Sequence, residues 1–138
     1  MFGVAAIFYN NISTGVNPNI VSNGTFDDGT GWSLASGWAI SGGTLNGTAT
    51  TTLASQDSPA IAPTNGVTYD FSFDVTAHTS GNLRIRVGGT SSATITISGT
   101  GAYTSSVVSG ADGTVKVDDG GAGGAFTGSI DNLVISEQ

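Results

Sequence analysis

The chain of 138 residues contains no cysteine, one histidine and only three basic residues. Without cysteine, neither a disulfide nor a thiolate metal site can form. A single histidine, His78, supports neither a histidine-based catalytic triad nor a metal site with several histidine ligands. Ten acidic residues against three basic ones give a net charge of −7, which repels the phosphate backbone of nucleic acids. The composition therefore argues against an enzyme and against a nucleic-acid-binding protein.

Long apolar runs and helical periodicity are also missing. No segment approaches the roughly eighteen apolar residues that a membrane-spanning helix needs, so no membrane span is expected. The 22 glycines interrupt the chain too often for long helices, and they show no three-residue period of the collagen type. The glycine-rich stretch "DDGGAGGAFTG" lacks the lysine of a phosphate-binding loop and is interpreted as an ordinary loop.

Alternating strands are what the sequence has instead. In "VTYDFSFDVTA", residues 67–77, apolar and polar residues alternate over eleven positions, and "NLRIRVGG" repeats the pattern after a short link. The two runs, 67–77 and 82–88, are predicted to form an antiparallel hairpin, with Asp74 across from Arg84 or Arg86. The side chains predicted to face the core are Tyr69, Phe71, Phe73, Leu83, Ile85 and Val87.

Shorter strand candidates, separated by glycine-containing turns, fill most of the remaining chain. Examples are "GWAIS", "GTLNGTATTTLAS", "ATITISG", "AYTSSVVSG", "TVKVDD" and "GSIDNLVISE". Eight to ten short strands predict an all-β protein, a two-sheet antiparallel β-sandwich of the jelly-roll type. Residues 1–19 are predicted to form an N-terminal arm, and residues 20–138 the sandwich domain.

Three motifs identify a family resemblance. "NIVSNGTFDDGTGWS" near the start, "YDFSFDV" in the middle and "GSIDNLVIS" at the end resemble carbohydrate-binding-module-like jelly rolls of the galactose-binding-like group. Such domains occur in secreted glycosidases and in structural proteins of phage particles, and this short, low-charge chain is more similar to the second group.

The resemblance implies a non-enzymatic virion protein, a capsid decoration, cement or fibre-type jelly roll at the particle surface. Its expected partners are other virion proteins or copies of itself. The alternative is a stand-alone carbohydrate-binding module that recognises glycans, and a hydrolase is the least favoured interpretation.

The resemblance also implies a structural calcium ion. In family members an acidic residue after the motif phenylalanine and an aspartate of the closing strand help to hold the ion. The matching positions are Asp27, after Phe26, and Asp131, before Asn132. The alternative is that Asp27 and Asp131 serve only turn and backbone hydrogen bonds.

The two tryptophans allow two interpretations. Trp32 matches the family's core tryptophan, and burial is favoured for Trp38 as well, because an isolated indole is commonly buried with its N–H bonded. The alternative for Trp38 is a platform on which a sugar stacks. The outward face of residues 67–77 carries no aromatic side chain, which argues against sugar binding there.

The arm contains a large share of the chain's aromatic residues, although it lies outside the predicted sandwich domain. Exposed apolar clusters of this kind mark interfaces. Two outcomes stay open: the arm pairs with the sheet of its own domain, or it docks on a neighbouring subunit. Its candidate partner-binding residues are Phe2, Val4, Ile7, Phe8 and Tyr9.

Overall fold

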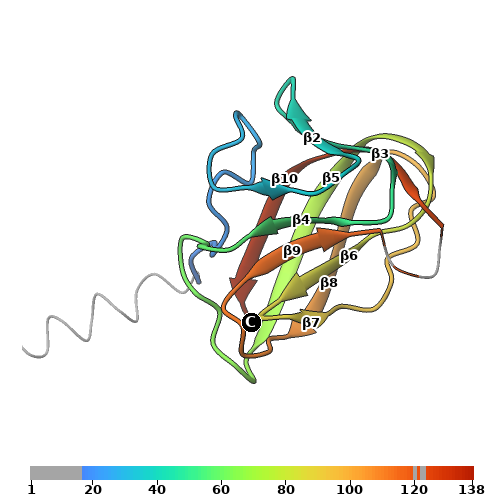
Figure 1. The fold of residues 1–138 in the computed structure, drawn as a ribbon. Helices are drawn as coiled ribbons and strands as arrows, with labels where there is room; N and C mark the ends of the chain where they lie inside the picture. Colours follow the sequence, from blue (N-terminus) through green and yellow to red (C-terminus); the bar gives the residue numbers. More distant parts are fainter. Residues whose placement is uncertain (1–16, 120, 122–123) are drawn as a thin grey trace, which may run out of the picture.

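The computed structural model describes residues 17–119, 121 and 124–138, and within these ranges it contains ten β-strands and no helix. The strands form two five-stranded antiparallel sheets that lie one over the other (Figure 1). Sheet A contains, in spatial order, β1 (Ser33–Leu34), β4 (Leu53–Gln56), β9 (Val115–Asp118), β6 (Arg84–Val87) and β7 (Thr90–Ser91). Sheet B contains β2 (Trp38–Ser41), β3 (Thr44–Thr50), β10 (Phe126–Glu137), β5 (Thr68–Ser80) and β8 (Gly101–Val108). The predicted all-β sandwich is confirmed.

The core lies between the two sheets and is built mainly by alternation along the strands. In β5 the residues at positions 69, 71, 73 and 75 are buried, while their neighbours in sequence point outward. In β6 and β9 the same period of two places alternate residues against them from sheet A. All six side chains that the alternation predicted to face the core are buried: Tyr69, Phe71, Phe73, Leu83, Ile85 and Val87.

The predicted hairpin of residues 67–77 with 82–88 is wrong. β5 continues to Ser80 and lies in sheet B between β10 and β8, whereas β6 lies in sheet A between β9 and β7. Gly81, at φ +80°, connects the two strands where the chain crosses between the sheets. A side chain there would meet the backbone of Ala125 at 2.5 Å, so only glycine fits. Both runs alternate because each has one face in the core, and this pattern does not tell which sheet a strand joins.

The predicted pairing of Asp74 with the arginines is wrong for the same reason. Asp74 accepts a hydrogen bond from Asn132 Nδ2 at 2.9 Å, within sheet B. Arg84 and Arg86 instead bind Asp118 on the neighbouring strand of sheet A.

The shorter strand predictions are largely confirmed, with two differences. The segment "GTLNGTATTTLAS" forms two strands in different sheets, β3 and β4, because the chain turns after Thr50. The segment "ATITISG", residues 93–99, forms no regular strand and contributes only an isolated bridge between Ile95 and Leu83.

The start of the described chain is already joined to the sandwich. Asn17 Nδ2 donates to Glu137 O at 2.7 Å, and Asn19 Oδ1 accepts the backbone N–H of Ile135 at 2.9 Å. The arm residues singled out in the sequence lie outside the described residues: Phe2, Val4, Ile7, Phe8 and Tyr9. Among the residues described, no helix is long and apolar enough to cross a membrane.

Candidate functional site

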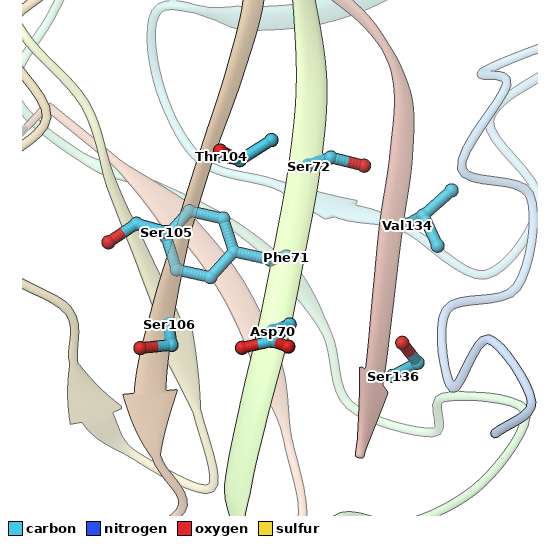
Figure 2. A pocket seen from close by; sticks show the side chains of 8 residues that line it. All are labelled: Asp70, Phe71, Ser72, Thr104, Ser105, Ser106, Val134 and Ser136. Carbon is cyan, nitrogen blue, oxygen red and sulfur yellow. The ribbon is translucent and has the colours of Figure 1, made fainter. Parts of the chain in front are cut away.

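The outer surface of sheet B forms a polar face across β8, β5 and β10. Because cross-strand partners point to the same side of a sheet, outward residues of the three strands line up in rows. The polar face consists of the rows Ser106–Asp70–Ser136 and Thr104–Ser72–Val134. These six residues line a shallow hollow of about 530 Å³. Figure 2 shows their side chains spread over the three strands.

The polar side chains of this face have no internal partner. Within the part of the chain that the structure describes, the side chains of Asp70, Ser72, Thr104, Ser106 and Ser136 make no hydrogen bond. A hydroxyl or carboxylate without a protein partner bonds to water and can exchange that water for a ligand. Val134, which is 42% exposed, supplies an apolar surface among them. The face can therefore offer several hydrogen bonds and one apolar contact to a flat polar ligand.

The other half of sheet B is different, because its polar side chains bond to one another. Asn46 on β3 accepts hydrogen bonds from Ser129 Oγ at 2.6 Å and from Thr44 Oγ1 at 3.0 Å. Its amide nitrogen donates to the carbonyl oxygen of Ser41 at 3.2 Å. These groups link β2, β3 and β10 and are not available to a ligand.

The outer surface of sheet A carries all three basic residues of the chain. Asp118, only 2% exposed, accepts hydrogen bonds from Arg84 Nε at 2.9 Å and from Arg86 Nε at 2.5 Å. Hydrogen bonds to Asp118 raise the pKa of Arg84 above its ordinary value. Lys116 pairs with Asp112 at 3.4 Å. This cluster borders a hollow of about 710 Å³, but its charges hold β6 and β9 together.

Both tryptophans are buried, as the sequence favoured. Trp38 is 6% exposed, stacks on Phe126 with ring centroids 5.9 Å apart, and donates its indole N–H to Thr52 O. Trp32 packs on Phe26 and donates to Asn23 O at 3.1 Å. Trp38 therefore presents little surface on which a sugar could stack.

The two calcium candidates lie on neighbouring segments. Leu133 N donates to Gly24 O at 2.9 Å, which ties the loop containing Asp27 to the irregular part of β10 that contains Asp131. Both carboxylates take part in local turns: Asp27 accepts from Thr25 Oγ1 at 2.8 Å, and Asp131 from the following backbone N–H. Within residues 17–119, 121 and 124–138, no group of three or more His, Cys, Asp or Glu side chains could hold a metal. The donor set thus does not fit a carboxylate-rich site, and a calcium ion here would rely on backbone oxygens.

His78 has a structural contact. Its Nε2 lies 2.9 Å from Gly81 O, at the point where the chain crosses between the sheets, and its ring packs near Phe126. His78 belongs to β5 and not to the short link that the hairpin prediction placed between residues 77 and 82.

Sequence reasoning recognised only part of the polar face. It placed Asp70 and Ser72 on an outward strand face, but it did not bring β8 and β10 beside them. The alternation of "AYTSSVVSG" and "DNLVISE" marks which residues point outward, although it cannot identify the neighbouring strand. Sequence reasoning also missed the ion-paired Asp118. The alternation in "TVKVDD" was the only sequence feature that could have indicated its orientation.

No family model matches the sequence, and no match was found among the curated proteins. Among solved structures, the chain is similar to a CBM35 from Paenibacillus barcinonensis, at 20% identity and a TM-score of 0.45. That alignment covers 75% of this chain and 92% of the other. The description of the fold therefore rests on the strands and their pairing.

Proposed function

We propose that the protein is a non-catalytic binding module whose polar face holds a neutral, polyhydroxylated ligand, a glycan. The observation that carries the proposal is the set of five polar side chains that face one hollow without an internal hydrogen-bond partner. Sugar hydroxyls both donate and accept, as the hydroxyls of Ser72 and Thr104 do, and the Asp70 carboxylate accepts from two neighbouring sugar hydroxyls. Val134 packs against the C–H surface of the ring.

The proposal specifies a neutral ligand because the chain has a net charge of −7 and the face contains Asp70 and no base. An acidic glycan would be repelled. The absence of an aromatic platform on the polar face predicts weak binding. Three or four hydrogen bonds at about 0.5–1.5 kcal/mol each correspond to dissociation constants on the order of 1 mM.

The test is a titration of isotope-labelled protein with a panel of neutral and acidic oligosaccharides, followed by amide NMR shifts. Neutral ligands should shift the amides of β5, β8 and β10 at the polar face, and acidic ones should not. The double variant Asp70→Ala/Ser72→Ala should lose these shifts. The matched control is Asp57→Ala, which removes one acidic charge from an exposed position away from the face.

Shifts that persist in the double variant would place the ligand elsewhere on the molecule. An absence of shifts with every neutral oligosaccharide at 10-fold the expected constant, about 10 mM, would refute the glycan proposal.

As a second function we propose the role expected from the sequence: a capsid decoration, cement or fibre-type protein at the virion surface. The apolar residues of the arm support it, since they call for a partner surface on virion proteins or on copies of the chain. Two measurements separate the two proposals. A virion protein co-purifies with particles, and this attachment is lost when residues 1–16 are removed; a stand-alone glycan binder shows a glycan-array signal without particles.

Calcium at Asp27 and Asp131 also remains a proposal. The hydrogen bond between Leu133 N and Gly24 O supports it by placing both segments together. If calcium binds the folded state, a chelator should lower the melting temperature of the parent and leave Asp131→Ala unchanged. An unchanged melting temperature of fully calcium-loaded parent after chelation would rule the site out.

A further inference from the structure

The four edge strands of the sandwich differ greatly in length. In sheet A the edges are β1 and β7, each of two residues, and in sheet B one edge is β2, of four residues. The remaining edge, β8, has eight residues, and within the described chain its backbone pairs with β5 alone. A long edge presents a row of unpaired N–H and C=O groups that can pair with another strand.

β8 also lacks the features by which proteins usually block a long edge. Its sequence, "GAYTSSVV", contains no charged residue and no proline, and it forms no bulge against β5. Val108, at its end, is 51% exposed and is the most exposed large apolar side chain of the described residues. A strand with these properties is suited to pairing with another strand.

We propose that β8 pairs with β8 of a second copy of this chain, antiparallel and about a two-fold axis through Ser105. Strand partners must point to the same side of a sheet, so an outward residue has to meet an outward residue. Pairing centred on Ser105 meets this condition, because it sets Thr104 opposite Ser106 of the other copy. It also sets Val108 opposite Ala102, so that the exposed valine gains an apolar neighbour.

The charge distribution does not oppose pairing of β8 with a second copy. An uncharged strand brings no like charges together when it pairs with itself, although the whole chain carries −7. The nearest acidic residues on the same surface, Asp70 and Asp74, lie on β5, one strand further in. In the dimer the two β5 strands are three strand spacings apart, about 14 Å. That distance exceeds the screening length of about 8 Å in physiological salt.

The pairing joins the two copies of sheet B into one continuous sheet of ten strands. The two polar faces then lie on the same side, next to one another. The dimer does not depend on the glycan proposal, because its contacts are backbone hydrogen bonds along the edge.

The test is sedimentation analysis of the full chain over a concentration series. The parent should move from 13.7 kDa towards twice that mass as the concentration rises. In the double variant Thr104→Lys/Ser106→Lys, each introduced lysine faces an introduced lysine of the other copy. The dimer should weaken about tenfold or more. In Thr104→Lys/Ser106→Glu, opposite charges face each other, and the dimer should be at least as strong as that of the parent.

The matched control is Ala39→Lys/Thr48→Lys, which adds the same two charges to exposed positions on β2 and β3, the half of sheet B away from β8. It should dimerise like the parent. Melting temperatures of all variants verify that each is folded.

Amide hydrogen exchange provides a second readout. Exchange in residues 102–108 should slow as the concentration rises, while exchange in β2 stays unchanged. Removal of residues 1–16 should leave the dimer intact. A parent that stays monomeric up to about 1 mM, a lysine–glutamate variant as dissociated as the double lysine variant, or a dimer lost with residues 1–16 would each overturn the proposal. The last result would assign the β8 edge to the arm.

Discussion

The outer surfaces of the two sheets use polar residues in opposite ways. On sheet A the charged side chains bind one another: Asp118 bridges Arg84 and Arg86, and Lys116 pairs with Asp112. On sheet B the side chains of the polar face bond to no part of the described chain. The difference separates residues that hold strands together from residues that remain available to a ligand, and it is the reason for placing the candidate site on sheet B.

The largest effect is expected on sheet A, from Asp118→Ala. The substitution leaves two partly exposed arginines without their shared partner, and the loss of their charged hydrogen bonds should cost about 2–3 kcal/mol. Urea unfolding of the variant and the parent measures the loss. Asp57→Ala, at an exposed position, serves as the control and should change the free energy of unfolding by less than about 1 kcal/mol. A loss from Asp118→Ala as small as that of the control would mean that the cluster does not stabilise the sheet.

A smaller effect is expected from Asn46→Ala, in the bonded half of sheet B. Ser129 and Thr44 lose their acceptor and Ser41 O loses a donor. Since each net hydrogen bond contributes about 0.5–1.5 kcal/mol, we expect a loss of about 1–2 kcal/mol in the same unfolding measurement. An unchanged free energy of unfolding would mean that the hydrogen bonds of Asn46 do not stabilise the fold. The two halves of sheet B would then not differ in this respect.

Substitutions on the polar face itself should hardly change stability. Ser72→Ala and Ser136→Ala remove hydroxyls that have no partner in the described chain, so each should stay within about 0.5 kcal/mol of the parent. Thermal unfolding measures this, and the NMR titration described above measures the accompanying loss of binding. If either variant costs more than about 1 kcal/mol, the hydroxyl has a structural role and the contrast between the sheets is weaker than described.

The smallest effect concerns pH at Asp112, in the turn before β9. Burial alone raises the pKa of Asp112, but hydrogen bonds from Thr114 and the charge of Lys116 outweigh it, and the pKa falls below its ordinary value of 3.8. Because the pKa is lower in the folded state, the stabilisation is complete above pH 3.8 and is lost as the pH falls through the folded-state value. The Asp112 side chain is 42% exposed, so the effect stays below about 1 kcal/mol.

Unfolding of Asp112→Asn beside the parent at pH 7 and at pH 2.5 checks this expectation. The difference between the two proteins should be smaller at the lower pH. A difference that grows on acidification would contradict the direction of the shift.

The sequence predicted the fold class and which side chains are buried, because both follow from the period of two along each strand. It could not predict which strands are neighbours. Residues 67–77 and 82–88 show the same alternation whether they share a sheet or face each other across the core, and the crossing at Gly81 decided between these possibilities. Every error about Asp74, Arg84 and Arg86 follows from that single misplacement.

For the same reason, only part of the candidate site could be predicted from the sequence. A row such as Thr104–Ser72–Val134 draws one residue from each of three strands, and β5 and β10 are separated by more than 45 positions in the chain. Burial of the tryptophans was easier to predict, since an indole in a turn-rich segment without further exposed aromatics is most stable in the core.

The two buried indoles have a practical consequence for spectroscopy. Trp32 sits beside Phe26 under the opening loop, whereas Trp38 stacks on Phe126 at the start of β10. Neither belongs to the polar face or to β8. Intrinsic tryptophan emission therefore reports on the core at two separate places, beside Phe26 and at the start of β10. We expect this emission to change on unfolding and to stay unchanged when a ligand or a second copy binds on the outside.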